Sequence, residues 1–306
     1  MHPALFPPTK PLLTYGITPP KLNYDETKRR VVAAAQAKRI AALPIDALVV
    51  YDLQDESSRT DAQRPFPFLR CIDPATYAFD YLHAVKVPKI VYRSVSEQTP
   101  DTLQRWLGEL HARGGATVLV GAPSRDQARS LTLTEAYAVR RTHQPTLPCG
   151  GVLIAERHER AQDEHARVLA KIDRGCQFLI SQAVYSVTAS KDVLSDLYYR
   201  CQAEKRDMPP VLVTLSPCGS RRTLEFMEWL GISIPHWLQN DLLHANDILR
   251  TSVQLCLSIF DELQRFARGK GFRLGCNVES VSLRKDEIDA SVELVHAVRR
   301  ALSDGE

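Results

Sequence analysis

Apolar residues along this chain follow two alternating patterns. Short, nearly continuous apolar runs predict buried strands, and these cover residues 12–17, 47–51, 89–93, 117–120, 151–155, 178–182, 211–215 and 273–277. Between them, apolar residues recur at helical spacing, which predicts helices over residues 25–42, 73–84, 99–112, 133–143, 159–174, 190–203, 220–230, 247–269 and 284–302. Ser190 is the expected N-cap of the helix over residues 190–203.

About eight strand–helix units follow one another without a long polar linker. Uninterrupted strand–helix alternation predicts a parallel sheet. Eight units of this size favour closure into a (β/α)8 TIM barrel, a fold of roughly 250 residues, over an open doubly wound sheet. We therefore expect one barrel domain over residues 12–306, preceded by a proline-rich N-terminal arm at residues 1–11. No G-x-G-x-x-G follows any predicted strand, which argues against a dinucleotide-binding Rossmann domain.

Amino-acid composition limits which kinds of molecule this protein is expected to bind. The formal net charge is only +3 and the arginines are scattered, so neither nucleic acid nor an anionic membrane is expected as a partner. The seven cysteines contain no C-x-x-C pair, which indicates reduced thiols in a cytoplasmic protein. The N-terminus lacks the features of a signal peptide, and no apolar run is long enough to span a bilayer. His158 has no second His or Cys at ligand spacing, so no metal site is expected.

In a barrel the functional site lies at the C-terminal ends of the strands. Polar residues gather at these ends in the sequence: Tyr51, Asp52, Asp55, Glu56, Arg93, Glu156, His158, Gln182, Asn277 and Glu279. The acids after the second strand can raise one another's pKa and prepare one carboxyl as a proton donor. The alternative is a solvated loop paired with Arg59 and Arg64. Glu156 and Glu279 are equally open to a structural role as partners of nearby arginines.

Several motifs occur in an order that resembles the methylenetetrahydrofolate reductases. Pro19-Pro20-Lys21 resembles the end of that family's first strand, and Glu156-Arg157-His158 resembles its PE-x-H motif. Residues 171–182, which run from a helix end through a glycine to a strand ending in Gln182, resemble the family's sixth helix–strand step. Residues 211–237 resemble the family's next strand and its F-x-x-x-x-G-x-x-IP-x-W segment.

The chain also departs from this family. The first-strand glutamate, which is the family's usual proton donor, falls on Gly16, the aspartate near the flavin falls on Pro123, and the histidine after the third strand falls on Arg93. Lys171 is kept and Glu164 replaces an aspartate of the flavin-binding helix, whereas Arg167 and Ala170 differ. FAD is therefore expected to be absent or weakly bound. The chain resembles a divergent branch of the family, similar to the flavin-independent mycobacterial-type enzymes.

The resemblance implies reduction of 5,10-methylenetetrahydrofolate to 5-methyltetrahydrofolate by direct hydride transfer from NADH or NADPH. Because the loop after the second strand should lie beside Gly16, Glu56 and Asp52 are the expected catalytic acids. Gln182 is expected to bind the pterin ring, and the other expected substrate-binding residues are Tyr51, Arg93, Glu156, Asn277 and Glu279. Lys171, Glu164 and His158 are the expected cofactor-binding residues. The alternatives are a folate-binding barrel without catalysis and a methyltransferase component that acts on a methylated pterin.

Overall fold

The protein is a closed barrel of eight parallel strands in sequential order, which confirms the predicted TIM barrel. The computed structural model describes residues 10–57, 60–122 and 130–303 of the chain. The strands are β1 (Leu13–Ile17), β2 (Ala47–Val50), β3 (Lys89–Ser94), β4 (Ala116–Val120), β5 (Cys149–Leu153), β6 (Phe178–Ala183), β7 (Val211–Leu215) and β8 (Leu274–Glu279). Pairing of β1 with β8 closes the barrel, with Gly16 opposite Glu279.

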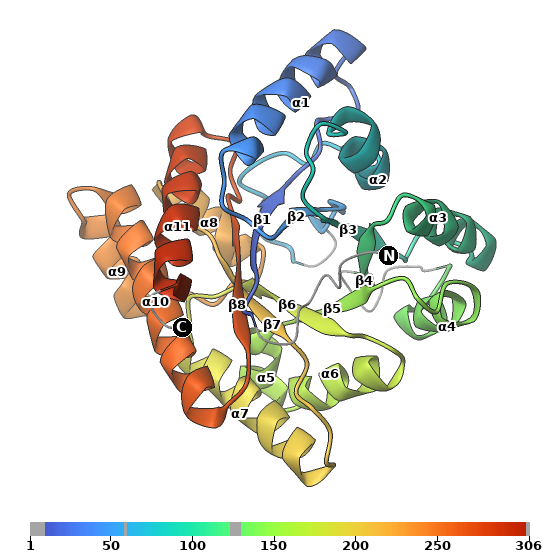
Figure 1. Ribbon diagram of the computed structural model, residues 1–306. Helices are drawn as coiled ribbons and strands as arrows, with labels where there is room; N and C mark the ends of the chain where they lie inside the picture. Colours follow the sequence, from blue (N-terminus) through green and yellow to red (C-terminus); the bar gives the residue numbers. More distant parts are fainter. Residues whose placement is uncertain (1–9, 58–59, 123–129, 304–306) are drawn as a thin grey trace.

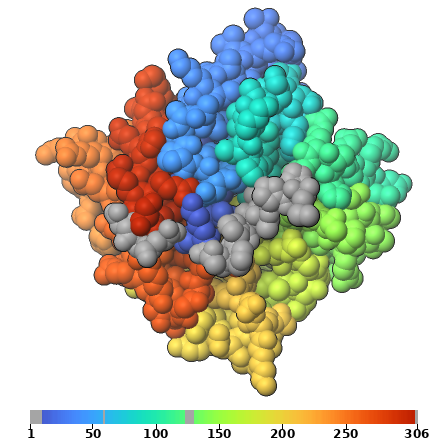
Figure 2. Space-filling model, in the orientation of Figure 1, coloured from blue at the N-terminus to red at the C-terminus, as the bar shows by residue number. Residues whose placement is uncertain are grey.

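The helices form a ring around the strands, as Figure 1 shows in a view roughly along the barrel axis. They are α1 (Glu26–Ala41), α2 (Pro74–Thr76), the π-helical η2 (Tyr77–Tyr81), α3 (Pro100–Ala112), α4 (Leu133–His143), α5 (Ala155–Ala161), α6 (Glu164–Asp173), α7 (Val187–Ala203), α8 (Arg221–Trp229), α9 (His236–His244), α10 (Ile248–Lys270) and α11 (Lys285–Ser303). Because the barrel is closed, the last helix returns to the first, and α11 (red) lies beside the α1 region (blue) in Figure 2.

Two apolar layers hold this arrangement together. Alternate strand residues such as Val49, Ile90 and Ile180 fill the barrel interior, and the residues between them in sequence pack outward against the helices. Alternation of side chains along a strand produces this division. It also decides which residues at the strand ends face the mouth of the barrel.

Three local features differ from the sequence prediction. The helix expected over residues 159–174 is two helices, because Gln162 takes a left-handed conformation (φ 52°) and ends α5. The prediction of Ser190 as an N-cap was wrong: Ser186 accepts a hydrogen bond from the Ala189 N–H and caps α7, while the Ser190 hydroxyl donates to the Ser186 carbonyl. Helix α9 was not predicted.

Within the described residues, no helix is both long and apolar enough to cross a membrane. All seven cysteines belong to the described part of the chain and are free thiols. Most of the expected N-terminal arm, residues 1–9, lies outside the described residues.

Candidate functional site

Gly16, Tyr51 and Glu279 meet at the C-terminal ends of three adjacent strands. Tyr51 extends β2, because its N–H donates to the Ile17 carbonyl (3.0 Å). A Cβ atom on Gly16 would lie 2.7 Å from Tyr51 Cε2 and 3.2 Å from Glu279 Cβ. The absence of a side chain at position 16 is therefore what allows the Tyr51 ring and Glu279 to occupy this point.

A chain of hydrogen bonds crosses the barrel interior to Glu279. The Thr14 hydroxyl donates to Asn277 Oδ1 (2.8 Å), and Asn277 Nδ2 donates to the Tyr51 hydroxyl (2.8 Å) and to Thr214 Oγ1 (3.3 Å). The Tyr51 hydroxyl is in turn hydrogen-bonded to the Glu279 carboxyl. Both polar ends of the Asn277 amide are thus used within the protein, so this residue orients Tyr51.

Glu279 has the electrostatic character of a proton donor. Burial raises its pKa to about 7, against an ordinary value of 4.5, even though the Tyr51 hydrogen bond acts in the opposite direction. Desolvation penalises the ionised carboxylate, which is why burial raises the pKa. Near neutral pH this carboxyl exists in both protonation states, as a general acid requires.

Tyr92 belongs to this site although the sequence analysis did not select it. Its ring meets the Tyr51 ring edge-on at 4.8 Å, and it packs in the interior in phase with Ile90. Arg93, the neighbouring residue that was selected, lies elsewhere: its guanidinium pairs with Asp73 (2.8 Å) and lies over Trp106. Strand alternation was the signal that separates these two neighbours.

The acids after β2 are distributed along the loop. Asp52 accepts a hydrogen bond from the Ser94 N–H (2.9 Å), and burial raises its pKa. Asp55 accepts from the Ser57 N–H and hydroxyl. Glu56 is half-buried, and both Glu56 and Asp55 interact electrostatically with Arg64. The structure therefore places these acids near β3 and Arg64.

The same loop extends to α8, which follows β7. The Trp229 indole donates to the Ala62 carbonyl (2.9 Å), and Arg222 Nε donates to the Pro65 carbonyl (3.1 Å). The loop after β2 therefore reaches the helix that follows β7, two strands beyond β1 in the closed barrel. At its far end the loop lies beside the residues that follow β1, because Cys71 forms an isolated antiparallel β-bridge with Lys21.

The loop after β2 and helix α8 line an open, positively charged pocket. Its volume is about 510 Å³, and its lining residues are Gln63, Arg64, Pro65, Arg221, Arg222 and Glu225. The Arg64 guanidinium lies over the Trp229 and Phe226 rings (4.7 and 5.3 Å), and Arg222 lies over Phe66 (4.5 Å). Three guanidinium groups against one carboxylate make this pocket suitable for an anion.

Gln182 and Glu156 both hold the segment after α8. Gln182 Nε2 donates to the Leu230 carbonyl (2.9 Å), and Glu156 Oε1 accepts from the Ser233 N–H (3.2 Å). Burial raises the pKa of Glu156. Gln182 is the last residue but one of β6, in a stretch where the pairing with β7 is irregular between Ile180 and Ala183.

Lys171 and Glu164, expected at a cofactor site, form a buried pair beside β5. Lys171 Nζ donates to the Val152 carbonyl and lies 3.9 Å from Glu164 Oε1, which accepts from the Ile154 N–H (3.2 Å). Burial lowers the pKa of Lys171. Both side chains thus hold the end of β5. Pro123, at the position of the family's flavin-side aspartate, lies outside the described residues.

His158, the third expected cofactor residue, faces α7. Its Nε2 lies 3.2 Å from Asp196 Oδ2, and His165 Nδ1 lies 3.8 Å from the same oxygen. The expected site residues are therefore dispersed. Tyr51, Asn277 and Glu279 meet at the strand ends. Gln182 and Glu156 hold the segment after α8, and Lys171 and Glu164 lie at β5. Asp52 bonds the Ser94 amide at β3, Glu56 interacts with Arg64, Arg93 pairs with Asp73, and His158 lies among the outer helices.

Comparison with known structures identifies similar proteins that match nearly the whole chain. An uncharacterized protein from Clostridium thermocellum that binds two copies of 5-methyl-5,6,7,8-tetrahydrofolic acid is 46% identical, with a TM-score of 0.84, and the match covers 95% of this chain and 96% of that one. A GH113 β-1,4-mannanase shares the fold at 12% identity and a TM-score of 0.54, with 95% and 99% of the two chains covered. No protein-family model and no curated protein matches the chain.

Proposed function

This chain belongs to the family of the Clostridium thermocellum protein that binds two copies of 5-methyltetrahydrofolic acid, and on that premise we propose that it binds reduced folates at the mouth of its barrel. We further propose that it reduces 5,10-methylenetetrahydrofolate to 5-methyltetrahydrofolate with NADH or NADPH. The observation that carries the catalytic proposal is the half-buried Glu279, whose pKa desolvation raises to about 7, beside Gly16.

The reaction needs an acid at a defined point. The methylene carbon of the substrate is bonded to two nitrogens, and one of these C–N bonds must break to leave a reactive iminium. The bond's electron pair stays on the departing nitrogen, which takes a proton from the acid. Reduced nicotinamide, when bound, supplies the hydride that completes the methyl group.

In this proposal, Glu279 takes the place of the glutamate that methylenetetrahydrofolate reductases carry on their first strand. The proton donor of those reductases corresponds to Gly16 in β1. Glu279 is the register partner of Gly16 in β8. Its Cβ lies 3.2 Å from the point where a Gly16 Cβ would be. A carboxyl can therefore reach the same part of the mouth from the neighbouring strand, with Tyr51 holding it through the hydrogen bond.

Glu279 suits the role of acid better than Asp55 and Glu56 do, whereas burial raises the pKa of Asp52 as well. Asp52 accepts from the Ser94 amide, and Arg64 interacts with Asp55 and Glu56. A nearby guanidinium favours the ionised form of a carboxylate, which opposes proton donation. Catalysis by Glu56 or Asp52 remains the second hypothesis, and the variants Glu56→Gln and Asp52→Asn test it.

Direct hydride transfer without FAD is part of the proposal. Lys171, whose counterpart in the flavin-dependent enzymes faces the cofactor, is already engaged with Val152 and buried Glu164. A flavin phosphate would have to compete with both partners. We therefore propose that the nicotinamide approaches the folate directly.

The arginine-lined pocket fits the acidic end of a folate. The glutamate portion of the ligand carries carboxylates, and guanidinium groups bind carboxylates with paired hydrogen bonds. A volume of about 510 Å³ lies within the range of small-molecule sites, roughly 300–1,000 Å³. We propose that Arg64, Arg221 and Arg222 bind these carboxylates.

Turnover of reduced nicotinamide tests the function. Purified protein should oxidise NADH or NADPH only when 5,10-methylenetetrahydrofolate is present, form 5-methyltetrahydrofolate in equal amount, and require no added FAD. Calorimetric titration with 5-methyltetrahydrofolate should show binding. Binding without oxidation would support a folate-binding barrel, and transfer of the methyl group to an added acceptor would support a methyltransferase component; either outcome would overturn the reductase proposal.

A further inference from the structure

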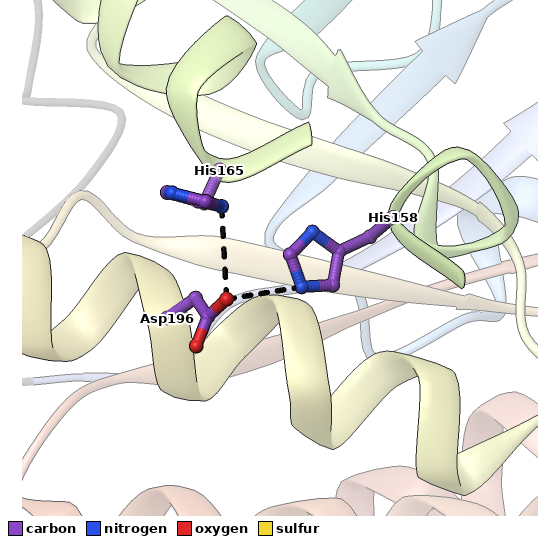
Figure 3. Close-up of side chains that lie close together, drawn as sticks. All are labelled: His158, His165 and Asp196. Atoms are coloured by element: carbon purple, nitrogen blue, oxygen red, sulfur yellow. Dashed lines mark ion pairs between the residues drawn. The ribbon is translucent and has the colours of Figure 1, made fainter. Parts of the chain in front are cut away.

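A second cluster of chemically capable side chains lies among the outer helices, away from the barrel mouth. His158 comes from α5, His165 from α6 and Asp196 from α7, and Figure 3 shows the two imidazoles converging on the carboxylate. His158 Nε2 and His165 Nδ1 lie 3.2 and 3.8 Å from Asp196 Oδ2. The three ligand atoms all lie within 4.8 Å of one another.

The contacts within the protein do not satisfy this cluster. The His158 side chain is fully buried, yet neither of its ring nitrogens makes a hydrogen bond, and His165 Nδ1 makes none either. The approach of Nε2 to Asp196 is close enough for a hydrogen bond but does not have the geometry of one. Buried polar groups without a partner are rare because each has given up its hydrogen bonds to water without replacing them. The arrangement therefore points to a ligand.

The arrangement resembles the coordination sphere of a transition metal. Around a tetrahedral zinc ion, with Zn–N and Zn–O bonds of about 2.0–2.2 Å, neighbouring ligand atoms lie about 3.3 Å apart. Small side-chain movements bring the observed 3.2 and 3.8 Å separations to this value. Two imidazoles and one carboxylate are also a donor set that zinc uses with an open fourth position.

We propose that His158, His165 and Asp196 bind a divalent transition-metal ion, with Zn²⁺ as the expected ion and water as its fourth ligand. Asp196 is 49% and His165 24% exposed, so the ion enters from solvent. The ion joins α5, α6 and α7, which pack against one another. Because α5 also carries Glu156, the metal stabilises the part of the barrel that holds the segment after α8.

Sequence spacing concealed this site. His165 lies seven residues after His158, across the break at Gln162, and Asp196 is on the helix that follows the next strand. Neither spacing matches a short metal-binding motif. The fold alone brings the three ligands together.

Metal titration of the intact chain tests the proposal without reference to activity. Apo protein prepared with a chelator should bind one Zn²⁺ per chain in calorimetry, and Co²⁺ should give the visible absorption of a tetrahedral site. Zn²⁺ should raise Tm, and chelator should reverse the rise. His165→Ala and Asp196→Asn, which alter partly exposed side chains, should weaken binding by more than about 100-fold.

Two matched variants control for surface chemistry. Asp192→Asn changes an exposed carboxylate on the same helix α7, and His143→Ala removes an exposed histidine from α4. Both should bind metal as the wild type does. Absence of Zn²⁺ and Co²⁺ binding by the folded wild type would overturn the proposal. Equal binding by the wild type, His165→Ala and Asp196→Asn would also overturn it.

Discussion

Gly16 and Glu279 are register partners on β1 and β8, and the missing side chain of one leaves room for the other. Tyr51 fills the rest of this space and holds the Glu279 carboxyl by a hydrogen bond. The position that resembles the reductases' first-strand glutamate is therefore a glycine here, and a carboxyl lies one strand away. In our account, the proton donor has moved between adjacent strands while its place at the barrel mouth is kept.

Gly16→Ala should damage the site by crowding it. The added Cβ would lie 2.7 Å from Tyr51 Cε2, and Asn277 and Tyr92 restrict the movement of this ring. We expect a loss of about 1–3 kcal/mol in the free energy of unfolding, and a fall in kcat/KM measured on the folded fraction. Gly121→Ala is the control, because its Cβ would meet Leu133 at an ordinary 3.8 Å. Wild-type kinetics in Gly16→Ala would contradict the proposed arrangement.

Tyr51→Phe should shift the pH profile of the proposed reductase reaction. The Tyr51 hydrogen bond lowers the pKa of Glu279, so its removal should raise that pKa further above 7. The alkaline limb of kcat/KM should therefore move to higher pH. Tyr92→Phe keeps an aromatic ring in place and should leave the limb nearly unmoved. An alkaline limb at the wild-type pH in Tyr51→Phe would show that Glu279 does not control it.

Arg221→Ala should weaken binding of the folate's acidic end. Arg221 lines the pocket, and a hydrogen bond to a charged group contributes about 1.5–3 kcal/mol. The folate KM should rise by about tenfold or more with little change in kcat, whereas binding of a pteroate without the glutamate should not change. Arg105→Ala on α3 removes an exposed arginine elsewhere and serves as the control. An equal loss for both ligands would contradict the assignment of the carboxylates to this pocket.

Glu279→Gln should stabilise the protein at alkaline pH. Between pH 4.5 and about 7 the folded state keeps a proton that the unfolded state releases, so wild-type stability falls as the pH rises through this window. Above it, the desolvated carboxylate costs on the order of 3 kcal/mol. Urea unfolding should therefore show Glu279→Gln to be more stable than wild type at pH 8, with a smaller difference at pH 4.5. No pH dependence of that difference would contradict the raised pKa.

Hydrophobic periodicity predicted the barrel because each strand is a short apolar run with a helix after it. It failed where backbone geometry decides: the left-handed Gln162 divides one predicted helix, and Ser186 caps α7 in place of Ser190. The alternation of side chains along β3 predicts that Tyr92 faces inward. Arg93 was nevertheless selected as a substrate-binding residue because it is charged.

Other parts of the site depend on contacts that no local pattern contains. Glu279 was correctly expected at a strand end, yet its relation to Gly16 depends on closure of the barrel by β1 and β8. Likewise, the carbonyl of Leu230 as a partner of Gln182, and Asp196 as a partner of His158, follow from tertiary packing.

The pH dependence of kcat in Glu279→Gln tests the central claim most directly. A positioned general acid contributes roughly 10²–10⁴-fold in rate, so kcat should fall by that factor while 5-methyltetrahydrofolate still binds with near wild-type affinity. The wild-type rate should fall as the pH rises through about 7, and this limb should be absent from the variant. Glu262→Gln, a carboxylate paired with Lys191 on the outer helices, should behave as wild type. A kcat near the wild-type value in Glu279→Gln, with the alkaline limb intact, would contradict the account.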